Sequence, residues 1–205
     1  MNGHWRRLLA AVVLAGCAPL TAVGGKLALS DQGFEVDLPQ GWYRVERVGH
    51  VHLRTAGFPY EAFLMEKDTD ALLITRDGLF LQSIRVERMS VEKDLTHTKR
   101  KFAPGMPAVD AAELELDNAR SNPVAFNFEL RENEPARVGG RPGFRLVYVW
   151  KTKDGLRLKR IHYGFLEGKW VYRLIYQAAE RHYFDQDLQT FERVRESFRL
   201  LTAPA

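Results

Sequence analysis

The sequence predicts an α+β fold, with a central antiparallel β-sheet flanked by helices. Several segments alternate apolar and polar residues, as half-buried strands do, and Asp-Gly or Gly-Gly pairs separate some of them. These pairs favour tight turns between neighbouring strands. Two other segments repeat apolar residues every three or four positions, which is typical of amphipathic helices. Runs of strands with only two helices among them favour a sheet against which the helices pack.

The first expected strand covers residues 34–39, which alternate in polarity and stop at a proline. A hairpin is expected next, with arms over 71–75 and 79–89. Its turn is predicted at Asp77-Gly78, because this pair is a strong hairpin signal. On the second arm, one face is expected to carry Phe80, Ile84 and Val86.

Two helices are expected, one in the middle of the chain and one near its end. The first is predicted from the spacing of Val109, Ala112, Leu116 and Ala119, and Pro123 marks its end. The second, of roughly 14 residues, closes the chain. Its apolar positions are Phe184, Leu188, Phe191, Val194 and Phe198.

Between the helices lies the clearest β region, over residues 126–178. Turns are expected at 139–143, 154–155 and 167–169, where glycines gather. Leu158 and Ile161 would point to opposite faces of one strand, so we expect a β-bulge near Lys159-Arg160 that brings them to the same face.

Length and composition limit the class of protein. The chain has 205 residues, 45% of them hydrophobic, which predicts a single globular domain over residues 31–205. Its one cysteine excludes an intramolecular disulfide framework and a thiolate-rich metal cage. The hydrophobic residues are too many for a disordered chain and too dispersed for a protein with several membrane spans.

The N-terminal segment resembles an export signal. Arg6 and Arg7 precede the apolar stretch Leu8–Leu14, and small residues lead to Cys17. Leu14-Ala15-Gly16-Cys17 is similar to the lipobox of bacterial lipoproteins, in which the cysteine thiol receives diacylglycerol and the chain is cut just before it. This resemblance implies a signal peptide over 1–16, followed by lipidated Cys17 and a flexible tether that reaches residue 30.

Two other interpretations of this segment stay open. Residues 8–25 carry no charge and could form an uncleaved span, although glycines and a proline dilute them. A plain secretory signal, with Cys17 there by chance, is the second alternative. We favour lipidation, because several acyl chains hold a protein stably at a membrane.

Cleavage before Cys17 would also change the charge of the chain. It removes Arg6 and Arg7 and no acidic residue, so the formal net charge falls from +4 to +2. The sequence pI near 9.2 is therefore partly a property of the signal. We expect no nucleic-acid partner.

Both ends of the expected domain resemble the PsbP-like superfamily. The opening element is Phe34-Glu-Val-Asp-Leu-Pro39-Gln-Gly41-Trp42, and the closing one is Phe191-Glu-Arg-Val194-Arg-Glu-Ser197-Phe198-Arg199. The turn at 139–143 fits the same plan. The resemblance implies an α/β/α sandwich. The superfamily includes the photosystem II subunit PsbP, a Ran-binding nuclear import factor and DcrB-type bacterial lipoproteins, most of which are binding or assembly factors.

Residues that could carry chemistry do not form a known catalytic pattern. His50 and His52 could share a face of a strand and ligate a metal, but partly exposed strand histidines are the simpler interpretation. No serine lies in a Gly-x-Ser-x-Gly motif, and Ser197 is expected to form local hydrogen bonds at a helix end. We therefore expect no enzyme, no cofactor and no metal.

A basic hairpin is the main candidate for a binding surface. It carries one acid, Asp154, among five cations: Lys151, Lys153, Arg157, Lys159 and Arg160. These cations could contact anionic lipid headgroups, a cell-wall polymer or an acidic partner. A solvated turn, whose lysines discourage edge pairing, is the alternative.

A set of aromatic residues gives a second candidate, a pocket for a hydrophobic or sugar ligand. Packing between sheet and helix is the more common use of such a set. Its members are Phe144, Tyr148, Trp150, Tyr163, Phe165, Trp170, Tyr172 and Tyr176.

Taken together, these patterns predict a lipid-anchored bacterial envelope protein with a non-catalytic binding or assembly role and an envelope protein as its partner. Ala18 after the lipidated cysteine resembles lipoproteins sent to the outer membrane, where the domain would face the periplasm. A periplasmic carrier of a hydrophobic ligand is the alternative, and an envelope hydrolase is a third.

Overall fold

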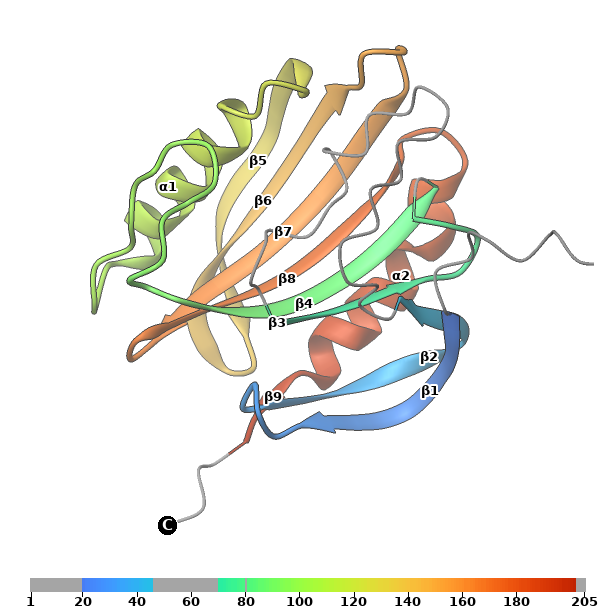
Figure 1. Cartoon of the computed structure of the whole chain (residues 1–205), viewed down its shortest axis with the longest axis horizontal. Coiled ribbons are helices and arrows are strands. Elements are labelled where there is room, and N and C mark those ends of the chain that lie inside the picture. The colour runs from blue at the N-terminus through green and yellow to red at the C-terminus, as the bar shows by residue number, and fades with distance from the viewer. Residues whose placement is uncertain (1–19, 46–69, 80, 202–205) are drawn as a thin grey trace, which may run out of the picture.

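The computed structural model describes residues 20–45, 70–79 and 81–201, which form one antiparallel sheet and two helices (Figure 1). The strands are β1 (Leu20–Leu29), β2 (Phe34–Val45), β3 (Asp70–Thr75), β4 (Gln82–Ser90), β5 (Phe126–Val138), β6 (Arg141–Lys151), β7 (Arg157–Glu167), β8 (Trp170–Ala179) and β9 (Arg199–Leu200). The helices are α1 (Ala108–Arg120) and α2 (Tyr183–Ser197).

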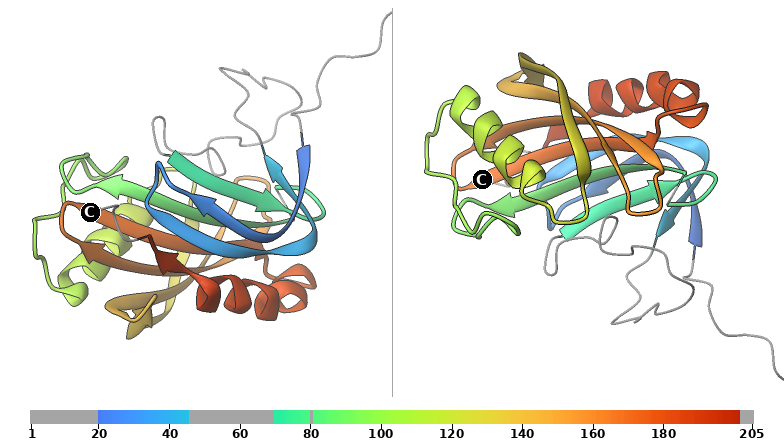
Figure 2. Two further views of the ribbon diagram at one scale, coloured as in Figure 1. Left: turned by 90° about the horizontal axis from the view of Figure 1, so that it is seen from below. Right: turned by 90° about the horizontal axis from the view of Figure 1, so that it is seen from above.

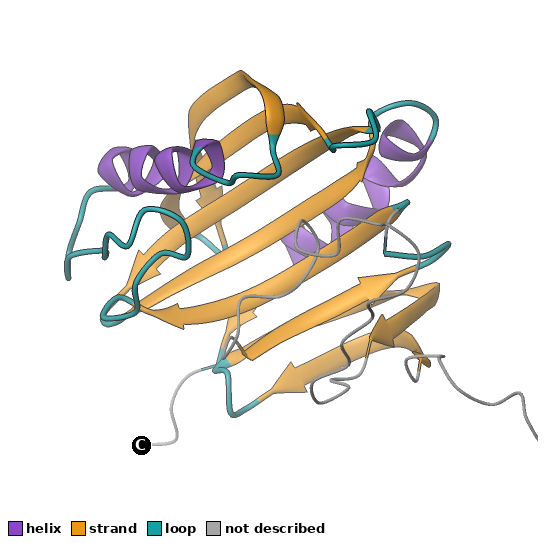
Figure 3. Ribbon diagram, turned by 45° about the horizontal axis from the view of Figure 1, so that its top comes forward, coloured by secondary structure: helices purple, strands orange, loops and turns teal. Residues whose placement is uncertain are grey.

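The strands pair in the order β1-β2-β3-β4-β8-β7-β6-β5, and β9 adds to β2. All of these pairs are antiparallel. Helix α2 carries the chain from β8 back to β9 and passes behind the strands (Figure 3). The sheet is strongly twisted, as the views from below and above show (Figure 2).

The helices pack on opposite faces of the sheet, and each lies nearer to a different edge strand. Helix α1 contacts β5, β6 and β7, whereas α2 contacts β2, β4 and β8. The expected α+β class is therefore confirmed. The expected flanking by helices is confirmed only in part, because in the described part of the chain each helix covers only some of the strands on its face.

Two hydrophobic cores result, one on each face. In β7, Leu158 belongs to the core beneath α1, and Ile161 belongs to the core beneath α2. The pairing of β7 with β6 and β8 runs without a shift, so the expected β-bulge near Lys159-Arg160 is wrong. Residues of opposite parity are both apolar because both faces of this strand are buried.

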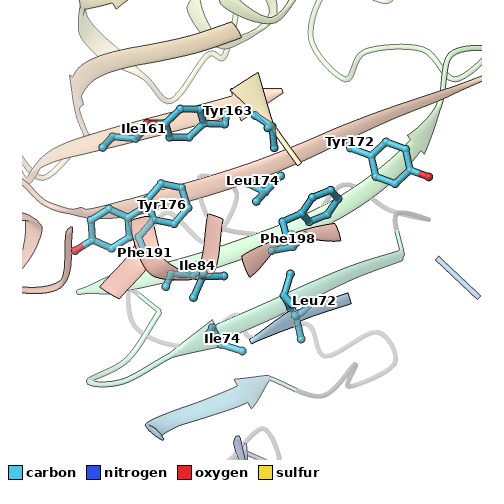
Figure 4. Packing of buried hydrophobic residues seen from close by; sticks show 14 of the residues in the cluster. Leu72, Ile74, Ile84, Ile161, Tyr163, Tyr172, Leu174, Tyr176, Phe191 and Phe198 are labelled. Atoms are coloured by element: carbon cyan, nitrogen blue, oxygen red, sulfur yellow. The ribbon is translucent and has the colours of Figure 1, made fainter. Parts of the chain in front are cut away.

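The core beneath α2 is rich in aromatic rings (Figure 4). Phe191 of α2 stacks on Tyr176 of β8 with 5.4 Å between ring centroids, and Phe198 lies 5.4 Å from Phe34. The Tyr176 hydroxyl donates to the carbonyl of Phe184, at 3.0 Å. The spacing of apolar residues at the end of the chain thus correctly predicted a helix that covers the sheet.

The N-terminal strand corrects one expectation. Residues 20–29, predicted as part of a flexible tether, form β1 and pair with β2 from Leu20↔Val45 to Leu29↔Phe34. The pairing shifts between Val23 and Gly25, where Gly25 adopts a φ of +79°. Small residues and two glycines resemble a linker, but the segment pairs with β2 along one side of its backbone.

The end of α2 is bound to β2 by a side chain. The Ser197 hydroxyl donates to the carbonyl of Val194 at 2.8 Å, which confirms the expected local hydrogen bond. The same hydroxyl oxygen accepts a bond from the Asp37 N–H at 2.9 Å. This second contact connects the closing helix α2 to strand β2.

Candidate functional site

The predicted basic residues lie where β6 turns into β7. Lys151 ends β6, Lys153 stands in the turn, and Arg157, Lys159 and Arg160 open β7. The turn is closed by a bond from the Thr152 N–H to the Leu156 carbonyl at 2.9 Å. The structure therefore brings the five cations to one hairpin but points them in different directions.

Three of the five cations have partners within the protein. Arg157 donates to Glu180 and lies 3.4 Å from Glu129. Arg160 donates to Gln177 and to the Tyr148 hydroxyl, each at 3.1 Å.

The Arg157 guanidinium, as a hydrogen-bond donor, holds the pKa of Glu180 below its ordinary value. Lys159 lies 4.3 Å above the ring of Phe184. Only Lys151 and Lys153 have no partner within residues 20–45, 70–79 and 81–201. They are the cations that this hairpin offers to an outside group.

This hairpin belongs to one end of the sheet, which we call the Leu20 end. Pairing places Lys159 opposite Ala178, Ala178 opposite Gln82, and Leu20 opposite Val45. The Leu20 end therefore includes the start of β1, the turn after β3, the turn after β6 and the turn after β8. These segments lie toward the top and right of Figure 1.

Exposed apolar side chains lie at the same end, on segments that range from one edge of the sheet to the other. Among the described residues, the large hydrophobic side chains that remain exposed are Leu20, Tyr43, Val109, Phe126 and Leu156. All of them except Val109 lie at the Leu20 end, where Phe126 pairs with Lys151 and Tyr43 with Thr75. This end thus combines apolar groups with two available lysines.

A buried charged cluster, which the sequence did not reveal, lies on the α1 face. Arg173 of β8 donates to Glu115 of α1 at 2.6 Å and to Glu87 of β4 at 3.1 Å. All three side chains are less than 5% exposed. Burial opposes the charge of Glu87, but Arg85 and Arg173 outweigh it and hold the pKa of this carboxyl below its ordinary value.

His162 of β7 lies on the same face, beside this cluster. It is 3% exposed, and its Nε2 has no hydrogen-bond partner among the described residues. Burial, reinforced by Arg173, Arg160 and Arg85, lowers the pKa of His162 well below 6.5. The imidazole is therefore neutral at physiological pH. Nearby, Arg173 pairs with Glu87 and Glu115.

Several predicted features lie outside the described residues. They are Cys17, the signal segment 1–16, the pair His50 and His52, and Phe80. Within the described part of the chain, no group of three or more His, Cys, Asp or Glu side chains could hold a metal ion. No helix there is long and apolar enough to cross a membrane.

The predicted aromatic set divides between the two faces of the sheet. Phe144, Tyr148 and Trp150 belong to the core beneath α1. The remaining members pack in or against the core beneath α2: Tyr163, Phe165, Trp170, Tyr172 and Tyr176. Rings on opposite faces cannot line one pocket, so this set serves packing.

Comparison with solved structures identifies the fold. Cyanobacterial PsbP (CyanoP) from Synechocystis sp. PCC 6803 aligns with a TM-score of 0.53 and 18% identity, over 94% of this chain and 98% of that chain. The fold is PsbP-like. The Ran-binding protein Mog1p of Saccharomyces cerevisiae shares this PsbP-like fold, with a TM-score of 0.50 and 8% identity over 88% of this chain and 97% of that chain.

More distant or sequence-based likenesses add nothing to the PsbP-like assignment. LpqN of Mycobacterium tuberculosis, described as involved in cell envelope biogenesis, aligns with a TM-score of 0.42 and 10% identity over 90% of this chain and 91% of that chain. No family model and no curated protein matches the sequence. The likeness to CyanoP agrees with the fold that the motifs at the two ends of the domain predicted. A shared fold does not by itself establish a shared function.

Proposed function

We propose that this protein is a lipid-anchored accessory factor of the bacterial cell envelope, which binds or helps to assemble another envelope component. The observation that carries the proposal is the order of features at the N-terminus. A basic pair, an apolar stretch and Leu14-Ala15-Gly16-Cys17 follow one another as in a lipoprotein signal. Strand β1 begins three residues after Cys17, so cleavage before Cys17 would remove no described residue.

The proposed role is non-catalytic. The buried charged groups at the middle of the sheet support it, because Arg173 donates hydrogen bonds to both Glu87 and Glu115. Such a cluster connects α1 to the sheet and leaves its charges engaged. The two lysines and the apolar side chains at the Leu20 end lie at the surface and suit an interaction rather than a reaction.

The proposed location is the periplasmic side of the outer membrane. Ala18 supports this choice, because lipoproteins retained at the inner membrane of enterobacteria carry Asp at the corresponding position, and this chain does not. Fractionation of inner and outer membranes tests the location. Recovery of the lipidated protein in the inner-membrane fraction alone would contradict it.

Metabolic labelling with palmitate tests the anchor. The wild-type chain is expected to incorporate the label, and Cys17→Ala is expected to lose it and to keep residues 1–16. Thr21→Ser, a conservative change in the exposed start of β1, serves as the control that should label normally. A wild-type chain that never incorporates palmitate would refute the anchor.

Crosslinking in cells, followed by mass spectrometry, tests the accessory role. The anchored protein is expected to capture one envelope protein reproducibly, and Cys17→Ala is expected to reduce that capture because it removes the protein from the membrane. Capture of no partner by the anchored form would contradict a role in binding or assembly.

A further inference from the structure

The distance between the proposed anchor and the folded domain is short. Leu20, the first residue of β1, is only three residues from Cys17. Three fully extended residues span at most about 11 Å. The start of β1 must therefore remain within that distance of the main chain of Cys17, from which any lipid extends.

We propose that the Leu20 end of the sheet rests on the membrane surface, with the β6–β7 turn in contact with anionic lipid headgroups. This inference rests on the proposed lipid anchor, and it adds the orientation of the domain and its lipid-facing side chains. Lys151 and Lys153 bind phosphate groups, and Leu156 between the two strands inserts among the headgroups.

The surface chemistry supports this orientation. Of the large exposed hydrophobic side chains in the described ranges, Leu20, Tyr43, Phe126 and Leu156 all lie at this end. Aromatic and aliphatic groups of this kind partition into the interfacial layer of a bilayer. Each cation near an anionic surface strengthens binding by roughly fivefold.

The local charges at the β6–β7 turn also favour an anionic surface. Asp154 is the only acid within residues 151–160, where there are five cations. Arg157 is already paired with Glu180, and Arg160 donates to Gln177 and Tyr148, so both guanidinium groups are engaged within the protein. Lys151 and Lys153 remain as the two cations that meet the headgroups.

The sole cysteine allows a direct test of the orientation. A chain that begins at Cys17, which retains every described residue, is coupled through its thiol to maleimide-bearing lipid in vesicles. One set of vesicles contains phosphatidylglycerol and phosphatidylcholine, and the other contains phosphatidylcholine alone. Amide hydrogen exchange is then compared with that of the same chain capped with N-ethylmaleimide and mixed with vesicles that carry no maleimide.

Slower exchange is expected in residues 151–157 on the anionic vesicles, with no change in the turns at 139–140 and 167–169 at the opposite end of the sheet. Lys151→Gln with Lys153→Gln is expected to remove most of this protection. In sedimentation of the uncoupled chain with anionic vesicles, the same double variant should weaken binding by about 30-fold.

The matched control is Lys99→Gln with Lys101→Gln, which removes two exposed lysines far from the Leu20 end and should behave as wild type. Protection of the opposite end, equal protection on neutral vesicles, or no protection of residues 151–157 would each overturn the proposal. Because the anchor is attached chemically, such a failure concerns the orientation alone. Failure of palmitate labelling in cells would concern the anchor.

Discussion

At the residue scale, Arg173 holds α1 against the sheet. Its guanidinium bonds Glu115, 58 residues earlier in the chain, and Glu87, 86 residues earlier. These separations explain why the sequence did not reveal the cluster. An arginine within the apolar run of β8 was visible, but nothing in the run identified the carboxylates that meet it.

We expect Arg173→Met to lower the free energy of unfolding by about 3–5 kcal/mol, because it leaves two buried carboxylates without the guanidinium that bonds both. Urea-induced unfolding measures the change. Arg100→Met is the control, since Arg100 and Asp117 form a pair whose side chains are 57% and 43% exposed. Arg100→Met should lower the free energy of unfolding by at most about 1 kcal/mol. Equal losses in the two variants would contradict the role assigned to Arg173.

The buried imidazole of His162 predicts a loss of stability in mild acid. Burial first, and then the nearby arginines, keep its folded-state pKa well below 6.5. As pH falls through 6.5 the unfolded chain binds a proton that the folded chain does not, so the free energy of unfolding decreases.

Between about pH 7 and about pH 5.5 this contribution amounts to roughly 1 kcal/mol. His162→Leu is expected to flatten the pH dependence of unfolding by that amount, as measured by urea titrations at each pH. A variant with the same pH dependence as wild type would show that His162 is not responsible.

The basic hairpin was predictable as a group of residues but not as a set of contacts. Asp154-Gly155 indicated the turn, and the cations around it followed. The partners Glu180 and Gln177 come from β8 and the residue after it, and pairing between strands decides where they lie. Only the structure could separate the engaged cations from Lys151 and Lys153.

At the element scale, the turns were the most predictable features because they depend on a few local residues. The hairpin of β3 and β4 and the three turns after β5, β6 and β7 lie where glycines indicated them. Strand β1 was missed because it lies at the edge of the sheet, and only a few of its side chains pack on the core. An exposed edge strand lacks the alternation that reveals half-buried strands.

Contact between β6 and β7 requires a glycine at position 164. A Cβ built on Gly164 would lie 2.3 Å from the Cζ atom of Phe144, whose ring covers this position. We expect Gly164→Ala to destabilise the protein by about 1–3 kcal/mol, because the ring must move within a packed core. Thermal or urea-induced unfolding measures the effect.

Gly24→Ala provides the control for this substitution. Its nearest neighbour would be the side chain of Gln40 at 3.2 Å, which can move into solvent. The double variant Gly164→Ala with Phe144→Leu should lose less stability than the sum of the two single variants, because the smaller leucine leaves room for the added methyl group. A fully additive double variant would refute the proposed clash.

At the scale of the whole molecule, one sheet supplies both cores. Strand β7 contributes Leu158 to the core beneath α1 and Ile161 to the core beneath α2. The sequence predicted a sheet with helices, but it did not show that a strand could be buried on both sides. The expectation of one apolar face led to the incorrect bulge.

Because the two cores share strands, we expect them to unfold together. Phe191→Ala, in the core beneath α2, should lower the free energy of unfolding by about 3–5 kcal/mol. Leu114→Ala, in the core beneath α1, should lower it by about 2–5 kcal/mol. Both variants are expected to keep a single transition in which near-ultraviolet and far-ultraviolet circular dichroism change together. A second transition in either variant would show that the two faces are independent.

The pairing of β9 with β2 bears on when this chain can fold during its synthesis. The Asp37 N–H bonds a serine 160 residues later, and the ring of Phe198 completes the surroundings of Phe34. The ribosome must therefore add almost the whole chain before this core can close, and contacts between such distant residues form slowly. For the exported protein proposed above, this delay would be an advantage, because the chain would reach the export machinery before its core is complete.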